Sequence, residues 1–144
     1  MKKRRMKRVF TLGTFDLLHY GHINFLKRAK SFGDYLIVGL SSDDFVRAKN
    51  KEPYYTYNHR KIMVEAVRYV DEIVEETSFQ SEIEHAKTLG IDVFVMGDDY
   101  YGKFDYLKDD GIEVIYLPRT IQGEIPISTR KIKEDLKERR KEGF

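Results

Sequence analysis

The sequence predicts an α/β domain built on a mostly parallel sheet of five strands, with helices on both faces. Short apolar runs of strand length alternate along the chain with amphipathic stretches at helical spacing. The runs are nearly continuous in apolar residues, which is typical of parallel strands buried on both faces. The expected order, β-α-β-α-β-α-β-β-α, is that of a doubly wound, Rossmann-like fold.

The expected strands follow directly from the apolar runs. In chain order they are Val9–Leu12, Tyr35–Leu40, Ile73–Val74, Val93–Met96 and Val114–Leu117. The third run is the shortest, which indicates a strand at the edge of the sheet.

The expected helices are placed by their apolar spacing and by capping residues. They are His22–Phe32, Asn58 to about Tyr69, Ser81 to Leu89, and about Arg130–Arg140. Asn58 caps the second helix, and Ser81 with Glu84 forms a capping box for the third. Ser128 or Thr129 caps the last one.

Length and composition fit one domain over residues 1–144. Apolar residues make up 41% of the chain and charged residues 35%, which excludes collagen-like, low-complexity and disordered proteins. No apolar run approaches the roughly 18 residues that cross a bilayer. No apolar stretch of a signal peptide follows the basic start, so we expect a cytoplasmic protein without membrane insertion. The absence of cysteine excludes disulfides, thiolate chemistry and a cysteine-based zinc site.

The charge is distributed unevenly along the chain. Six of the first eight residues are basic, and we expect residues 1–7 to form a flexible basic arm. Between Val9 and Thr129 there are twenty acidic and thirteen basic side chains, so the body of the domain is acidic. We therefore expect no groove that binds the phosphates of a nucleic acid.

The loops that follow the strands are the expected place for a binding site. Right-handed crossovers bring the carboxyl ends of parallel strands to one edge of the sheet, where ligands bind. The segments at this edge are Gly13–His22, Ser41–Lys51, Gly97–Lys103 and Arg119–Thr129.

The first of these loops ends in His19-Tyr20-Gly21-His22, at the start of a helix. A helix N-terminus offers free N–H groups and a positive dipole to a phosphate, and Gly21 lets the backbone approach the anion closely. Two imidazoles add directional donors whose hydrogen bonds strengthen as negative charge develops on a phosphoryl group. Two other interpretations stay open here: ordinary half-buried histidines, or two metal ligands.

Together with this motif, several segments resemble the cytidylyltransferase branch of the nucleotidyltransferase superfamily. They are Thr14–Asp16 with His19-x-Gly21-His22, Tyr57-x-x-Arg60-Lys61, Arg68–Asp71, Val93–Asp99, Tyr116–Thr120 and Ile127–Thr129. The likeness covers about residues 7–138. It is strongest to the members that act on glycerol 3-phosphate on the route to teichoic acids and related polymers, and it implies a homodimer.

The resemblance implies a reaction and its substrates. The phosphate of a small acceptor attacks the α-phosphorus of CTP, CMP is transferred, and pyrophosphate leaves without a covalent enzyme intermediate. With glycerol 3-phosphate as the acceptor the product is CDP-glycerol. Mg²⁺ is expected as a cofactor carried by the CTP phosphates, with no metal ligands from the protein.

The resemblance also implies roles for individual residues. For CTP binding it implies Thr14, Phe15, His19, Tyr20, Gly21, His22, Lys51, Arg60, Arg68, Asp99, Tyr100, Arg119, Thr120, Ser128, Thr129 and Arg130. The implied catalytic residues are His19, His22, Lys49 and Arg119, with Lys49 on the side of the acceptor. Asp16 either touches Mg²⁺ or orients the loop backbone.

Three departures from the family pattern leave the acceptor open. Glu82 stands where family members often have a lysine that contacts the acceptor phosphate. We expect Glu82 to point to solvent as a first-turn acid, with an orientation into the site as the alternative. The segment Ile121–Ile127 is longer than usual, and Arg130 replaces a threonine. Two alternative functions remain: a same-fold adenylyltransferase acting on a sugar phosphate or FMN, and a non-catalytic nucleotide-binding module.

Overall fold

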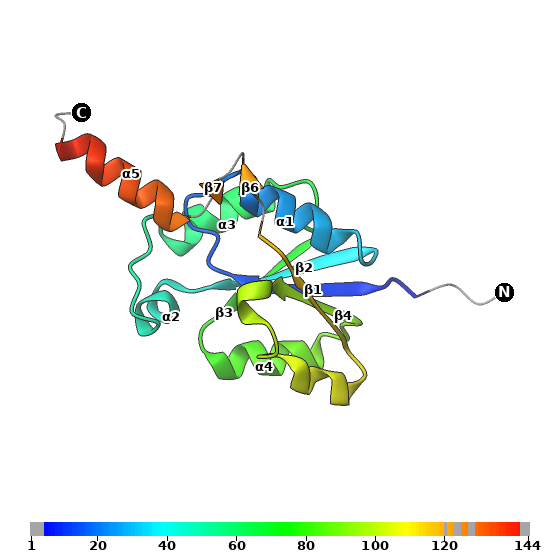
Figure 1. Cartoon of the computed structure of the whole chain (residues 1–144). Helices are drawn as coiled ribbons and strands as arrows, with labels where there is room; N and C mark the ends of the chain where they lie inside the picture. Colours follow the sequence, from blue (N-terminus) through cyan, green and yellow to red (C-terminus); the bar gives the residue numbers. More distant parts are fainter. Residues whose placement is uncertain (1–4, 120, 123–124, 127–128, 142–144) are drawn as a thin grey trace.

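The five expected strands form one sheet in which every pair of neighbours is parallel (Figure 1). The computed structural model describes residues 5–119, 121–122, 125–126 and 129–141. The strands are β1 (Arg8–Gly13), β2 (Tyr35–Ser41), β3 (Glu72–Glu76), β4 (Val93–Gly97) and β5 (Glu113–Leu117). Their spatial order is β3-β2-β1-β4-β5, so β3 is an edge strand as expected and the doubly wound prediction is confirmed.

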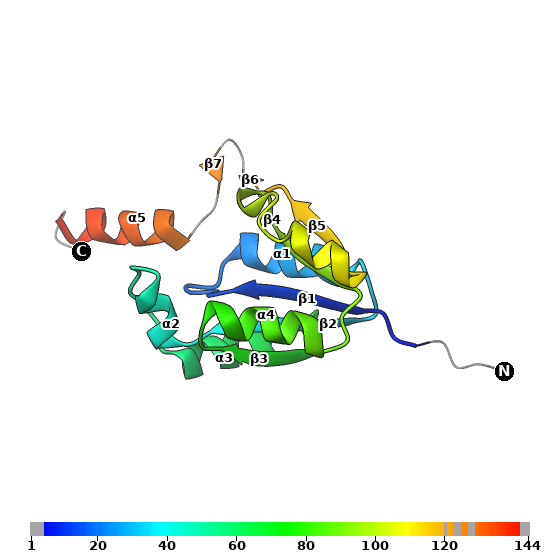
Figure 2. The same ribbon diagram turned by 90° about the horizontal axis from the view of Figure 1, so that it is seen from below.

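Helices cover both faces of the sheet. The α-helices are α1 (Tyr20–Lys30), α2 (Asp43–Ala48), α3 (Tyr57–Glu65), α4 (Phe79–Thr88) and α5 (Thr129–Lys141). Two 3-10 helices, η1 (Asp98–Tyr100) and η2 (Asp105–Asp110), follow β4, and β6 (Ile121–Gln122) pairs with β7 (Ile125–Pro126). Helices α1 and α3 lie on one face and α4 on the other (Figure 1). Helix α5 projects from the body at the end opposite the N-terminus (Figure 2).

The core has two layers, because successive residues of a strand point to opposite faces. In β1, Val9 packs in the layer under α1 and α3, whereas Phe10 packs in the layer under α4. The first layer contains Val9, Phe15, Leu26, Ala29, Leu36, Val38, Leu40, Val64, Val67, Val93, Val95 and Leu117. The second contains Phe10, Leu12, Ile37, Ala86, Ile91, Phe94, Met96, Leu107 and Ile112. In the described part of the chain, no helix combines the length and apolar character needed to span a membrane.

Several helix starts differ from the sequence-based expectation. Helix α1 begins two residues early, at Tyr20, because His19 caps it. Helix α3 starts at Tyr57 after Thr56 and ends at Glu65, short of the expected Tyr69.

Helix α4 shows why its predicted cap is wrong. It begins at Phe79, because the Ser78 hydroxyl accepts a hydrogen bond from the Ser81 amide at 3.0 Å. The Ser81 hydroxyl is used elsewhere and donates to Glu76 Oε1 on β3 at 2.8 Å. A tertiary contact therefore replaces the capping box expected between Ser81 and Glu84.

The sheet opens at the carboxyl ends of β1 and β4. The register between these strands holds only Val9 opposite Val93 and Phe10 opposite Phe94. One residue further on, the Thr11 hydroxyl donates to the Val95 carbonyl at 2.6 Å, so a side chain spans the widening gap. Because the strand order reverses between β1 and β4, a crevice at this point is where ligands bind in open α/β sheets.

Candidate functional site

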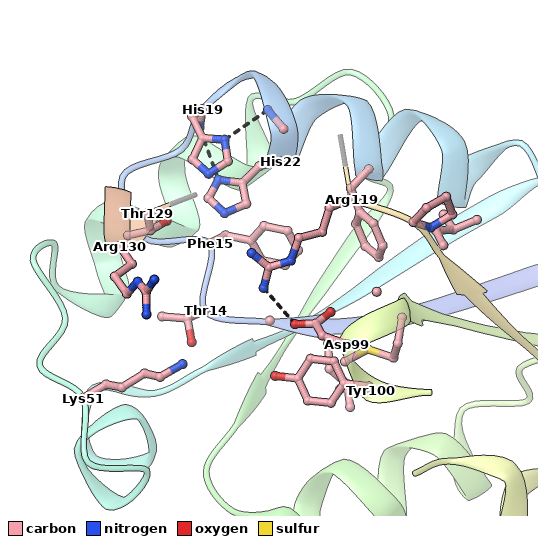
Figure 3. Close-up of a pocket in the computed structure, with 18 residues that line it drawn as sticks. Thr14, Phe15, His19, His22, Lys51, Asp99, Tyr100, Arg119, Thr129 and Arg130 are labelled. Atoms are coloured by element: carbon pink, nitrogen blue, oxygen red, sulfur yellow. Dashed lines mark hydrogen bonds and ion pairs between the residues drawn. The ribbon is translucent and has the colours of Figure 1, made fainter. Parts of the chain in front are cut away.

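A cavity of about 560 Å³ lies at the carboxyl ends of β1, β4 and β5 (Figure 3). We call it the main cavity. It is lined by Leu12, Gly13, Thr14, Phe15, His19, Gly21, His22, Phe25, Lys51, Met96, Gly97, Asp99, Tyr100, Leu117, Pro118, Arg119, Thr129 and Arg130. This volume is within the range of pockets that take small molecules and cofactors. Three of the four loops named from the sequence thus meet at one site, together with Lys51 from the fourth.

The loop after β1 is bent sharply to reach the cavity. Phe15 and Leu17 have φ of 49° and 51°, in the left-handed region that L residues rarely adopt. The Phe15 ring folds back over Gly13, where a Cβ would lie 2.5 Å from ring atom Cε2. Any larger residue at position 13 would displace Phe15, whose ring packs edge-on against His22 at 5.3 Å between centroids.

The two histidines are held by backbone hydrogen bonds in a defined tautomer. His19 caps α1, and its Nδ1 accepts from the Gly21 amide at 3.0 Å. His22 Nδ1 accepts from the His19 amide at 3.2 Å. A neutral ring that accepts at Nδ1 carries its proton on Nε2. The rings stack with centroids 3.8 Å apart, and each therefore keeps one N–H donor, at Nε2.

Burial keeps both rings neutral at pH 7. It lowers the pKa of His22 to about 3, with help from the neighbouring His19, and it also lowers the pKa of His19. His19 Nε2 is buried and has no hydrogen-bond partner among the described residues. A buried donor without a partner costs free energy, which a ligand with acceptor oxygens recovers on binding. The site is therefore prepared for phosphate oxygens by two neutral donors.

Charged groups are separated along the main cavity. Lys51, Arg130 and Thr129 lie at the end that holds the histidines, whereas Asp99 and Tyr100 lie at the other end (Figure 3). Thr129 opens α5, so the positive end of that helix dipole adds to the basic end. A polyanion is favoured at one end of the cavity and a hydrogen-bonding neutral group at the other.

Arg119 connects these two ends. Its Nη2 donates to Asp99 Oδ2 at 2.9 Å, and both side chains are about half exposed. An exposed pair of this kind contributes under about 1 kcal/mol, so Arg119 can turn to an incoming anion at little cost. Gly97 leaves room for the acid, since a Cβ there would lie 2.6 Å from Asp99 Oδ1.

Arg60 supports the loops and does not reach the main cavity. Its side chain is fully buried. The guanidinium donates to the carbonyls of Tyr55 at 3.0 Å, Thr14 at 2.9 Å and Ser41 at 2.9 Å, and it pairs with Asp43 Oδ1 at 2.8 Å. One buried cation thus joins the loop after β1, the end of β2 and the segment before α3. These contacts stand in place of the direct contact with CTP that the resemblance implies.

Asp16 has the same kind of role. Its carboxylate accepts from the amides of Tyr54 at 2.6 Å and Tyr55 at 3.0 Å, and it pairs with Lys133 at 3.1 Å. Its carbonyl accepts from the Thr129 hydroxyl at 2.6 Å. Burial alone would raise the pKa of Asp16, but the amide bonds and Lys133 outweigh it and lower the pKa. Of the two roles left open, orienting the backbone is the one that these contacts support.

Three of the remaining expected residues, Tyr20, Arg68 and Lys49, lie outside the main cavity. Tyr20 is 60% exposed, and Arg68 is exposed with its guanidinium over the Tyr69 ring. Lys49 lies beside the cavity, with its ammonium donating to Ser41 Oγ at 3.2 Å. Thr120 and Ser128 fall outside the described residues.

Lys133 was not predicted from the sequence, and it joins α5 to the segment before α3 and to the loop after β1. It donates to the Glu52 carbonyl at 3.1 Å in addition to its pair with Asp16. The signal was its spacing, four residues after Thr129 on the same helix face.

Glu82 contradicts the expectation that it points to solvent. It is half-buried on α4 and lines a second cavity of about 70 Å³. Helix α4 begins two residues earlier than predicted, so Glu82 lies further from the start of the helix than expected, and its side chain faces the small cavity.

Comparisons with known proteins agree with this geometry. A family model described as cytidylyltransferase-like matches residues 10–137. The glycerol-3-phosphate cytidylyltransferase of Bacillus subtilis (strain 168) is 54% identical over 131 residues, covering 91% of this chain and 98% of that protein. The Staphylococcus aureus (strain NCTC 8325 / PS 47) protein of the same name is 53% identical over 131 residues, covering 91% and 96%. A solved lipopolysaccharide core biosynthesis protein from Thermoplasma volcanium GSS1 matches with a TM-score of 0.65 and 28% identity, over 82% of this chain and 99% of that one.

Proposed function

The chain belongs to the cytidylyltransferase-like family, and on that premise we propose that it transfers CMP from CTP to glycerol 3-phosphate. The products are CDP-glycerol and pyrophosphate. The relatives with more than half of their residues identical carry this activity in their names and match nearly the whole chain. The observation that supports the chemistry is the pair of neutral imidazoles, each with its free N–H on Nε2 at the main cavity.

The transfer is an in-line displacement at phosphorus. An oxygen of the acceptor phosphate forms a bond to the α-phosphorus of CTP, and the bond from that phosphorus to the bridging oxygen of pyrophosphate breaks. Negative charge spreads over the phosphoryl oxygens on the way, and fixed donors that meet it lower the barrier. His19 and His22 supply these donors without giving up a proton.

The other lining residues have roles that follow from their charge. Lys51, Arg130 and the N-terminus of α5 bind the β- and γ-phosphates, since a helix N-terminus with nearby cations favours anions. Arg119 leaves Asp99 to meet the phosphates as they enter. Asp99 and Tyr100 then face the base, where a carboxylate accepts a hydrogen bond from an exocyclic amine such as that of cytosine.

Mg²⁺ enters with the nucleotide in this proposal. Within the described ranges, no group of three or more carboxylate or imidazole side chains is placed to hold a metal ion. Asp16 is engaged by two amides and Lys133. Mg²⁺ is commonly held by substrate phosphates and water, so a site without a carboxylate cage would suit it, and it would supply positive charge to offset that of the leaving pyrophosphate.

We also propose that the protein works as a cytoplasmic homodimer and supplies CDP-glycerol for teichoic acids or related polymers. The segments 54–60 and 68–71 are the proposed contact, and two exposed apolar side chains, Tyr54 at 58% and Ile62 at 63%, lie on or beside them. Burying such side chains against a second copy removes apolar surface from water. Light scattering at micromolar concentration checks this, and the mass of a monomer would contradict it.

The experiment that tests the function is identification of its product. Protein, CTP, Mg²⁺ and glycerol 3-phosphate are incubated together, and the mixture is analysed by mass spectrometry for CDP-glycerol. The same reaction is run with other polyol phosphates, amino-alcohol phosphates and sugar phosphates. CDP-glycerol formed faster than any other product supports the proposal, and a faster reaction with a sugar phosphate contradicts it.

A further inference from the structure

The small cavity beside the main one has a single charged group in its wall. It is lined by Leu12, Phe79, Glu82, Ile83, Ala86, Phe94, Phe104, Tyr106 and Leu107. Leu12 also lines the main cavity, so the two adjoin at the end of β1. Only Glu82 among these lining residues is charged, and Tyr106 is the other polar side chain.

Within the part of the chain that the structure describes, the carboxyl group of Glu82 has no hydrogen-bond partner. No described residue donates a hydrogen bond to it, and Lys49 acts on it only through its charge. The titratable groups that face it are Lys49 from the end of α2, Glu76 from β3, Tyr100 from η1 and Tyr106 from η2. Burial is the largest effect, and it raises the pKa of Glu82 to about 7.

Lys49 interacts electrostatically with one residue of each cavity. Its ammonium is fixed by Ser41 Oγ at 3.2 Å and by the face of the Phe45 ring at 4.2 Å. The charge of Lys51, which lines the main cavity, acts on it together with that of Glu82 in the small one. Lys49 therefore lies near both Glu82 and the basic end of the main cavity, where an acceptor phosphate would be held.

Resting on the proposed function, we propose that the small cavity receives the organic end of the acceptor and that Glu82 determines its class by hydrogen-bonding its hydroxyl groups. At about 70 Å³ the small cavity has an eighth of the volume of the main cavity, which favours a short chain over a sugar ring or a flavin. A carboxyl group accepts hydrogen bonds from hydroxyls when ionised, and it both donates and accepts when protonated. The acceptor is thus a short polyol monophosphate.

The test compares two esters that differ only in their hydroxyl groups, glycerol 3-phosphate and propyl phosphate, with CTP as the donor. We expect the wild type to prefer glycerol 3-phosphate by at least tenfold in kcat/KM. Glu82→Ala is expected to reduce this preference to threefold or less, with the KM for CTP unchanged. Glu84→Ala, on the exposed face of the same helix, is the matched control and keeps the wild-type preference.

A tenfold preference that survives in Glu82→Ala would overturn the proposal, as would a wild type without any preference. These results differ from failure of the proposed function, in which the wild type forms no cytidylyl product with either ester.

If Glu82→Ala does not fold, Glu82→Gln keeps the shape and removes the titration. Because ionised Glu82 repels the acceptor phosphate, we expect the wild-type KM for glycerol 3-phosphate to rise from pH 6 to pH 8 more steeply than that of Glu82→Gln. Superimposable pH profiles would overturn the proposal.

Discussion

Replacing His22 by alanine shows whether this side chain serves as a catalytic hydrogen-bond donor or only as a packing residue. In the structure His22 Nδ1 is engaged by the His19 amide, so Nε2–H is the one donor that the ring offers a substrate. The change removes this donor and leaves the His19 amide without its partner. We expect kcat to fall at least a hundredfold while the fold persists.

The size of both effects follows from these contacts. Loss of one donor aimed at developing charge costs roughly 3–4 kcal/mol in the transition state, or 10²–10³ in kcat. Loss of one neutral hydrogen bond costs about 1 kcal/mol of stability, which lowers Tm by a few degrees in a domain of this size. The rate is thus far more sensitive than the stability.

The assay is steady-state pyrophosphate release with CTP and glycerol 3-phosphate, paired with a thermal melt of the same preparation. His59→Ala is the matched control, because His59 is exposed on α3 and lies outside the main cavity. We expect it to keep wild-type kcat. A less than tenfold loss of kcat in His22→Ala, together with a drop in Tm above 10 °C, would show that His22 is a packing residue.

Three further predictions concern His22, Arg60 and Asp16. Burial lowers the pKa of His22 from 6.5 to about 3, so below pH 6.5 the unfolded chain takes up a proton that the folded protein does not, and stability is lost as the pH falls. In urea unfolding at pH 7 and pH 5, the wild type is expected to lose about 2 kcal/mol more than His22→Ala. Equal losses would contradict this. Arg60→Ala leaves three carbonyls and one carboxylate without their partner, and it is expected to lower the free energy of unfolding in urea by about 3–5 kcal/mol. Arg68→Ala, at an exposed position, is the control and is expected to change it by no more than about 0.5 kcal/mol. Similar values for the two variants would refute the supporting role of Arg60. In Asp16→Asn the side chain cannot accept from both loop amides, and it loses the ion pair with Lys133 of α5. The KM for CTP is expected to rise about tenfold, in line with about 1.5–3 kcal/mol for a hydrogen bond to a charged group. An unchanged KM would mean that the loop with Lys51 holds its position without Asp16.

The strands were predictable because buried strands appear in the sequence as runs of apolar residues. Tyr35–Leu40 is continuous, and it forms β2 with both faces covered. The short run Ile73–Val74 extends at both ends into β3, where backbone pairing with β2 includes Glu72 and Glu76. Pairing of this kind depends on the neighbouring strand and leaves no hydrophobic signal.

Helix boundaries depend on choices that one sequence does not decide. Ser78 and Ser81 are both able to cap α4, and the contact from Ser81 to Glu76 selects Ser78. Helix α2 was missed although Ser42 caps it and Asp43 favours its positive end, because six residues are too few for a periodic pattern.

The lining of the main cavity was predictable where a motif follows a strand, as at Gly13–His22 and Gly97–Tyr100. The burial of the arginines was not predictable, because nothing in the sequence around Arg60 and Arg68 distinguishes a buried side chain from an exposed one. Arg60 shares the buried face of α3 with Val64, whereas Arg68 follows the end of the helix and is exposed. Only the packing of α3 against three loops distinguishes a buried support from a surface charge.

In this cytidylyltransferase, Asp99 and Tyr100 at one end of the main cavity are expected to select cytosine over adenine. The most direct test is a reaction with glycerol 3-phosphate as the acceptor and equal concentrations of CTP and ATP in competition, in which the cytidylyl and adenylyl products are separated and measured. We expect CDP-glycerol to exceed the adenylyl product at least tenfold. Equal amounts of the two products, or more of the adenylyl product, would contradict the claim.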